Sequence, residues 1–178
     1  GTSAISALGY VMPFYFVIMG ITFGLSSGTT TVIAQYIGMG DRYKANETAH
    51  NSLFIAFLMS IINFLFVFFL GKEALMLQGM EPEVLKLAIQ YFYVMAYGSI
   101  FMIFGIFLRA ILIGEGESIL PMAALGIGTV LNIILDPFFI DAWGIAGAAY
   151  ATIVSQIIVL LIFIYFFLIK KTTYISLF

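Results

Sequence analysis

The sequence predicts an all-α fold, a polytopic bundle of helices that cross a membrane. Of its 178 residues, 63% are hydrophobic and only 9% are charged, whereas soluble domains average roughly 45–50% apolar and about 25% charged residues. Seven lysines and arginines against nine acidic residues leave no basic surface for nucleic acid. A soluble fold of this size could not bury so much apolar surface, so a multi-pass membrane protein is the class that remains.

Five apolar stretches are long enough to cross a bilayer as helices, which requires about 20 residues each. The charged residues divide the chain into these stretches. We expect spans near 10–37, 52–70, 84–113, 119–140 and 145–169. The sequence begins at Gly1 with no signal-peptide pattern and stops soon after the last span, so we expect a piece of a longer chain.

The first break between spans is the one extended polar segment. Gly38 and Gly40 tolerate the backbone of a helix end, and Asp41 is suited to cap a following helix. We expect residues 41–50 to form a short helix at the membrane interface, separate from the second span. His50 is the only histidine and there is no cysteine, so the sequence offers neither a histidine metal set nor thiol chemistry.

The later breaks also carry helix-end signals. We expect Gly71 to end the second span and Pro82 to precede the third, because proline fits the first turn of a helix. Ser118 is suited to cap the fourth span. Residues 141–144 then form the tight turn before the fifth span, with Trp143 as an anchor at the membrane interface.

The basic residues predict the orientation, because lysine and arginine are enriched in cytoplasmic loops. Those that follow the odd-numbered spans outnumber those that follow the even-numbered spans: Arg42, Lys44, Arg109, Lys170 and Lys171 against Lys72 and Lys86. We therefore expect the first break, the third break and the C-terminus to lie in the cytoplasm.

A glycine stripe lies in the first span. Gly20, Gly24 and Gly28 recur at every fourth position and share one face of a helix. Small residues of this kind allow close packing of helices in lipid. The alternative is that the same face lines a substrate cavity.

Four other polar side chains within the spans each have two possible roles. Gln35, Asn63 and Gln156 either form hydrogen bonds between helices or line a cavity. Arg109 either extends to the water at the cytoplasmic end of the third span or faces an internal cavity.

The fourth and fifth spans hold a candidate ion site. Asn132 and Asp136 are four residues apart and point the same way from one helix, and Pro137 loosens that helix by removing a backbone hydrogen bond. Counting outward from the hairpin turn places Thr152 between them in depth. Carboxylate, amide and hydroxyl oxygens suit a hard cation such as Na⁺, and a lone carboxylate in an apolar setting also suits a proton. The alternative is an acid near a helix end that reaches water.

Three motifs, in order along nearly the whole chain, resemble those of multidrug and toxic compound extrusion (MATE) transporters. The matching segments are AQYIGMGD at 34–41, GEGES at 114–118 followed by Pro121 and Met122, and NIILDP at 132–137 with GIAGAAYAT at 144–152. The sequence departs from the family pattern at Ile113, where many members have an arginine.

The resemblance implies that the five spans are helices two to six of twelve, within the N-terminal one of two lobes. It also implies an antiporter, not an enzyme, that exports drugs and other lipophilic or cationic compounds by alternating access. Na⁺ or H⁺ coupling would use Asp136 and Asn132, with Thr152 as a further ligand, and no other cofactor. The expected partners are a small-molecule substrate, the prokaryotic cytoplasmic membrane, and the first helix and C-terminal lobe of the same chain.

Two alternatives to this function stay open. A flippase for lipid-linked oligosaccharides, from the same superfamily, should have more cationic residues in its cavity than Arg109 alone. A membrane scaffold without transport would need no convergent polar site, and would leave Asp136 and Thr152 far apart and facing lipid.

Overall fold

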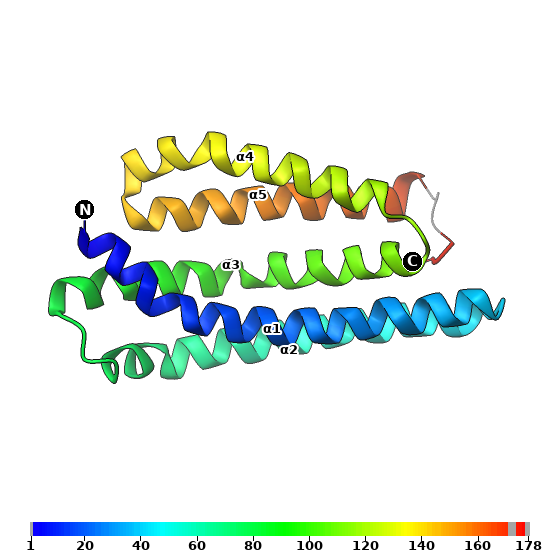
Figure 1. The fold of residues 1–178 in the computed structure, drawn as a ribbon, viewed down its shortest axis with the longest axis horizontal. Helices are drawn as coiled ribbons and strands as arrows, with labels where there is room; N and C mark the ends of the chain where they lie inside the picture. The colour runs from blue at the N-terminus through cyan, green and yellow to red at the C-terminus, as the bar shows by residue number, and fades with distance from the viewer. Residues whose placement is uncertain (1, 171–173, 177–178) are drawn as a thin grey trace.

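Five long helices, joined by short turns, make up the computed structural model, which describes residues 2–170 and 174–176 (Figure 1). Their bounds are Thr2–Gly38 (α1), Arg42–Met76 (α2), Pro82–Gly114 (α3), Ile119–Trp143 (α4) and Ile145–Tyr165 (α5), and a π-helical turn, Phe166–Lys170 (η1), continues the last one. All five are long and apolar enough to cross a membrane. This confirms the prediction of an all-α bundle with five spans. Lys171, used in the orientation argument, lies outside the described residues.

The first two helices extend beyond the expected spans. α1 begins at Thr2, and α2 runs without interruption from Arg42 to Met76. The prediction of a separate interfacial helix over residues 41–50 is therefore wrong, because this polar segment forms the first turns of α2. A helix of 35 residues is about 52 Å long, whereas the hydrocarbon core of a bilayer is about 30 Å thick, so its polar end can continue into water.

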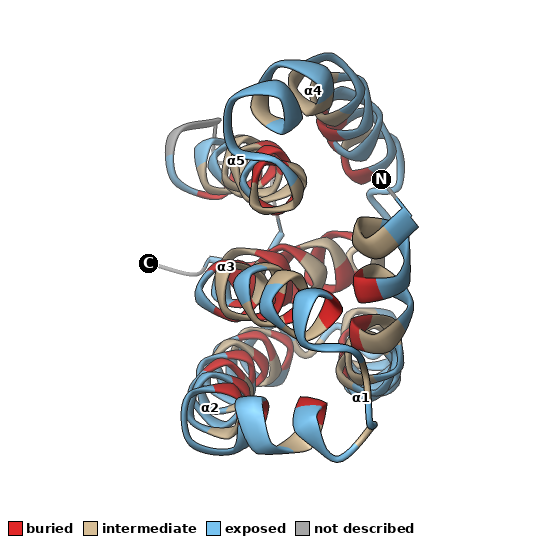
Figure 2. Cartoon of the chain, turned by 90° about the vertical axis from the view of Figure 1, so that its left-hand side faces the viewer, coloured by how far each residue is buried: buried red, intermediate tan, exposed pale blue. Residues whose placement is uncertain are grey.

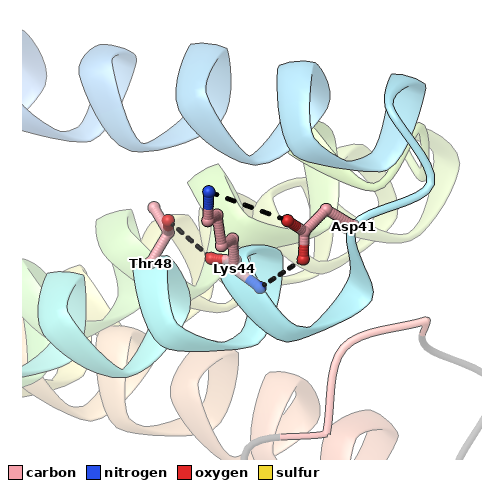
Figure 3. A network of polar contacts seen from close by, with 3 residues as sticks. All are labelled: Asp41, Lys44 and Thr48. Atoms are coloured by element: carbon pink, nitrogen blue, oxygen red, sulfur yellow. Dashed lines mark hydrogen bonds and ion pairs between the residues drawn. The ribbon is translucent and has the colours of Figure 1, made fainter.

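Asp41 starts α2 as the sequence predicts. Its carboxylate accepts a hydrogen bond from the backbone N–H of Lys44 at 3.0 Å, and the Lys44 ammonium lies 3.9 Å from the other carboxylate oxygen (Figure 3). The Thr48 hydroxyl then donates to the Lys44 carbonyl, one turn further along. Gly71 does not end α2, contrary to the prediction. It lies inside the helix, where a side chain would come within 3.3 Å of the Phe92 ring.

α3 runs through the middle of the bundle. It packs against α1 and α2 on one side and α5 on the other, whereas α4 packs chiefly on α5 as the second arm of a hairpin (Figure 2). The buried residues face the interfaces between helices, and large exposed apolar side chains cover the outer faces of α2 and α4. This distribution is the one expected of a bundle whose outer surface contacts lipid.

Glycines do allow close helix packing, but not at the predicted stripe. Gly24 and Gly28 are exposed, and a side chain added at either would meet no described atom within 4 Å. The packed face of α1 instead carries Thr22, Ser26, Thr29 and Ile33. Close approaches occur at other glycines instead: a side chain at Gly114 of α3 would come within 2.9 Å of Ile33, and side chains at Gly98 and Gly128 would overlap Ile153 and Val159 of α5. The predicted glycine stripe therefore has no packing partner among the described residues.

The helix ends gather in two groups. The turns at residues 39–41 and 115–118 lie at one end of the bundle together with residues 174–176, and we call this the Glu115 end (Figure 1). Glu115 accepts backbone hydrogen bonds from Tyr174 at 3.2 Å and Ile175 at 2.8 Å. The turns at residues 77–81 and at Gly144 lie at the opposite end, which we call the Trp143 end.

The cap of α4 differs from the prediction. The Ser118 side chain makes no capping hydrogen bond. The Glu117 carboxylate caps the helix instead, because it accepts hydrogen bonds from the backbone N–H groups of Ile119 at 2.8 Å and Leu120 at 3.0 Å. A carboxylate also interacts favourably with the positive end of the helix dipole.

Candidate functional site

The structure brings Asn132, Asp136 and Thr152 together. The Asn132 amide donates to Asp136 Oδ1 at 3.2 Å and lies 3.5 Å from Thr152 Oγ1, across the hairpin from α4 to α5. All three residues are half-buried. The set of polar side chains expected from the sequence is thus one cluster, which we call the Asp136 cluster.

Two local features position this cluster. The spacing of four residues places Asn132 and Asp136 one above the other on α4, and Gly147 lets α5 approach α4 so closely that a side chain there would overlap the Phe139 carbonyl. Pro137, the residue after Asp136, has no N–H group to donate to the carbonyl four residues earlier, at Ile133. The result is a tight hairpin with a weakened turn beside the carboxylate.

The cluster has the donor set for a monovalent cation or a proton. The Thr152 hydroxyl donates to the Ala148 carbonyl at 3.0 Å, so its lone pairs remain available on the side that faces Asn132. Rotation of the Asn132 amide about its last bond would present oxygen in place of nitrogen. No described residue donates a hydrogen bond to the second oxygen of Asp136, and a single carboxylate balances one positive charge.

Tyr91 of the central helix α3 lines a cavity of about 310 Å³ between α1, α2 and α3. The residues of the Asp136 cluster are not among those that line it. The three side chains of the cluster lie close together, contrary to what a scaffold without transport predicts.

Aromatic and aliphatic side chains make up most of the wall of this cavity, which we call the aromatic cavity. It is lined by Val11, Phe14, Tyr15, Val17, Ile18, Ile62, Asn63, Phe66, Val67, Tyr91, Phe92, Met95, Ala96, Ser99 and Met102. The buried Asn63 amide donates to the Ser99 hydroxyl at 2.8 Å, so it joins α2 to α3 and lines the cavity as well. A small apolar compartment with a few polar groups suits a lipophilic ligand.

Two further cavities continue along α3 toward the Glu115 end. One, of about 230 Å³, shares Tyr15 and Met102 with the aromatic cavity and is lined by Gln156 and Arg109. The other, of about 290 Å³, lies between α1 and α3 and is also lined by Arg109. Gln35 is exposed near the end of α1 and is not among the lining residues of these cavities.

Sequence reasoning missed some of the residues that line these cavities. Tyr91 and Tyr15 lie in apolar stretches with no local signal that marks them. Ser99 was detectable only indirectly, because a buried Asn63 requires a hydrogen-bond partner on a neighbouring helix. The partner itself is 36 residues away in the chain, so its identity depends on the packing of α2 against α3.

Five membrane-length helices around a polar cluster and a row of cavities define a multi-pass integral membrane protein. A family model described as MatE matches residues 1–138, and the chain belongs to that family. Members of the family are transporters, not enzymes, as the sequence predicted.

Sequence matches to several relatives extend over nearly all of this chain. Probable multidrug resistance protein YoeA of Bacillus subtilis is 28% identical over 172 residues, which are 91% of this chain and 36% of the relative. Multidrug export protein MepA of Staphylococcus saprophyticus is 30% identical over 171 residues, 94% of this chain and 38% of the relative. Probable multidrug resistance protein NorM of Thermotoga maritima is 31% identical and matches 87% of this chain and 35% of its own length.

Solved structures give the same result. An inward-facing multidrug resistance MATE family transporter superposes with a TM-score of 0.96 at 31% identity, covering 100% of this chain and 41% of that one. An outward-facing MATE family transporter gives 0.95 at 31% identity, with 100% and 40% covered. The chain thus spans about two-fifths of the length of these twelve-helix, two-lobe transporters.

Proposed function

We propose that the full-length protein is an antiporter, coupled to Na⁺ or H⁺, that exports drugs and other lipophilic or cationic compounds by alternating access. In this proposal the chain forms helices two to six, within the N-terminal lobe. The Glu115 end faces the cytoplasm, in line with the distribution of lysine and arginine along the chain. The names of the relatives, which describe multidrug resistance or export, support this class of substrate.

The observation that carries the proposal is the position of the Asp136 cluster. A carboxylate at the centre of a bilayer costs roughly 2.5–3.5 kcal/mol on insertion scales. Asp136 lies seven residues before the end of α4 at Trp143, so it bears part of this cost, which a bound cation or proton would offset. Asn132 and Thr152 supply further ligand oxygens beside this carboxylate, on a hairpin that packs against α3, the helix that also lines the aromatic cavity. A bound cation or proton would neutralise the negative charge of the hairpin.

Coupling then follows from differential binding. An ion and a substrate that favour opposite orientations of the lobe shift the same equilibrium in opposite directions. The chain superposes equally well on inward-facing and outward-facing relatives, with TM-scores of 0.96 and 0.95. This supports an exchange in which the lobe moves as a unit and its internal packing is kept.

Efflux from membrane vesicles tests the proposal. The full-length protein with Asp136→Asn should lose ion-coupled efflux of a lipophilic cationic dye by about 10-fold to 100-fold, the range for one charged hydrogen-bonded interaction of about 1.5–3 kcal/mol. Asp141→Asn is the matched control, because it removes a carboxylate from the exposed end of the same hairpin and should leave efflux unchanged. Undiminished ion-coupled efflux in Asp136→Asn would refute the assignment.

A further inference from the structure

Arg109 is the cation that requires an explanation in this bundle. It lies on α3 five residues before the end of the helix, about 8 Å from Gly114 along the axis. Its side chain is partly buried and lines two cavities, one between α1 and α3 and one between α1, α3, α4 and α5. The side chain therefore faces the cavities along the central helix, where its nitrogen atoms are not sealed from solvent within the described part of the chain.

Within the described residues, 2–170 and 174–176, no hydrogen bond or ion pair satisfies the Arg109 guanidinium. This group has five N–H donors and stays charged at any physiological pH. Within membrane proteins such charges normally pair with a carboxylate or face water in a functional cavity. The neighbouring walls supply Phe23 and Ile106, which line both cavities and hold no charge.

Two uncharged polar groups lie on the same cavity walls. Ser27 lines the cavity between α1 and α3, and Gln156 lines the one that reaches α5. Neither side chain has a hydrogen-bond partner among the described residues, so a hydroxyl and an amide N–H remain available, each on the wall of a cavity that Arg109 also lines. Ser26 and Thr30, by contrast, already donate to the carbonyls of Phe23 and Ala110.

We propose that Arg109, with Ser27 and Gln156, forms a subsite for the anionic group of a transported molecule. The ligand class is a lipophilic compound that carries a carboxylate or a phosphate, because a guanidinium binds two such oxygens side by side. The apolar body of the compound occupies the cavity toward Tyr15 and Met102, which continues into the aromatic cavity. This inference rests on the proposed export function and adds lipophilic anions to the lipophilic and cationic compounds named there.

The subsite is separate from the Asp136 cluster. Arg109 lies five residues before the end of α3 at Gly114, near the Glu115 end, whereas Asp136 lies seven residues before the end of α4 at Trp143, near the opposite end. The bundle thus has a carboxylate toward the Trp143 end and a guanidinium toward the Glu115 end. A negative cargo group bound at Arg109 is held away from the Asp136 carboxylate.

The test is a binding measurement on the purified full-length protein in phosphatidylcholine nanodiscs. The probes are a dansyl-labelled aliphatic carboxylate and its methyl ester, which share the apolar body and differ in charge. The wild type should bind the carboxylate at least tenfold more tightly than the ester. Arg109→Gln should reduce carboxylate affinity by about 10-fold to 100-fold and leave ester affinity within twofold, and Arg109→Lys should lose part of that affinity because the fork geometry is gone.

Matched controls separate the alternatives. Lys72→Gln removes one positive charge from an exposed site on α2. It should leave the binding affinity for both probes unchanged. Equal affinity of the wild type for both probes, or an equal loss of both in Arg109→Gln, would overturn the proposal. So would an effect of Arg109→Gln that appears only when phosphatidylglycerol is added, because the guanidinium would then serve a lipid headgroup. The readout is binding alone, so its failure is distinct from a failure of ion-coupled efflux in the Asp136→Asn test.

Discussion

Gly147→Ala should pull the two arms of the α4–α5 hairpin apart and so disrupt the Asp136 cluster. A methyl group at this position would overlap the Phe139 carbonyl and come within 2.8 Å of the Ile140 nitrogen. Both are backbone atoms, so no side-chain rotation can relieve the overlap. Inserting a carbon into a packed core typically costs about 1–3 kcal/mol, and the backbone contact places this change toward the upper end of that range.

The functional consequence follows from the geometry of the cluster. The Asn132 amide is already 3.5 Å from Thr152 Oγ1, at the limit of a hydrogen bond. Any widening of the hairpin removes Thr152 from the ion site, so Gly147→Ala should weaken ion coupling as well as stability. We expect a lower midpoint of thermal unfolding in detergent and weaker ion dependence of efflux in vesicles.

Gly126→Ala is the control for this prediction. Gly126 also lies on α4, is exposed, and has open space around an added methyl group. Alanine is favoured over glycine in a helix by roughly 1 kcal/mol, so this variant should be as stable as the wild type or slightly more stable. Wild-type stability and coupling in Gly147→Ala would refute the reasoning that close helix approach positions the cluster.

Two further predictions concern the Glu115 end. Asp41→Ala should lower the free energy of unfolding by about 0.5–2 kcal/mol through loss of the α2 cap, measured by denaturant titration with Glu47→Ala as the control; equal effects of the two would contradict it. Burial raises the pKa of the Glu115 carboxyl, against the opposing effect of the N–H groups of Ile175 and Tyr174 and of the nearby Arg42. The folded state therefore holds this proton more tightly than the unfolded chain, and the stabilisation that protonation provides is lost as the pH rises above about 4.5. The melting temperature of the wild type, relative to that of Glu115→Gln, should therefore fall as the pH rises above about 4.5. A difference between the two melting temperatures that does not depend on pH would contradict the prediction.

The number of spans and the composition of the Asp136 cluster are predictable from the sequence because both depend on local spacing. Charged residues separate the apolar stretches, and membrane thickness sets their minimum length. Asn132 and Asp136 share a helix face at any packing of that helix. Thr152 is close in sequence to the hairpin turn, so a count outward from the turn is enough to match its depth.

Helix ends and packed faces depend on contacts that the sequence does not encode locally. The polar segment at 41–50 continues α2 because nothing in it breaks a helix and water can solvate it beyond the bilayer. Gly24 and Gly28 have the spacing of a packing stripe, yet the tight contacts are at other glycines, among them Gly98, Gly114, Gly128 and Gly147. The neighbouring helix decides which glycine packs closely, and the same holds for the choice of Ser99 as the partner of Asn63.

The central claim is that Asp136 links ion binding to substrate binding. The most direct test is the affinity of the full-length protein for a lipophilic cationic dye, measured against Na⁺ concentration at fixed pH and against pH without Na⁺. Coupling between two sites typically changes affinity by about 5–150-fold, and it is reciprocal. The account predicts such a dependence on Na⁺ or on pH in the wild type and a flat response in Asp136→Asn. The same dependence in both proteins would contradict it.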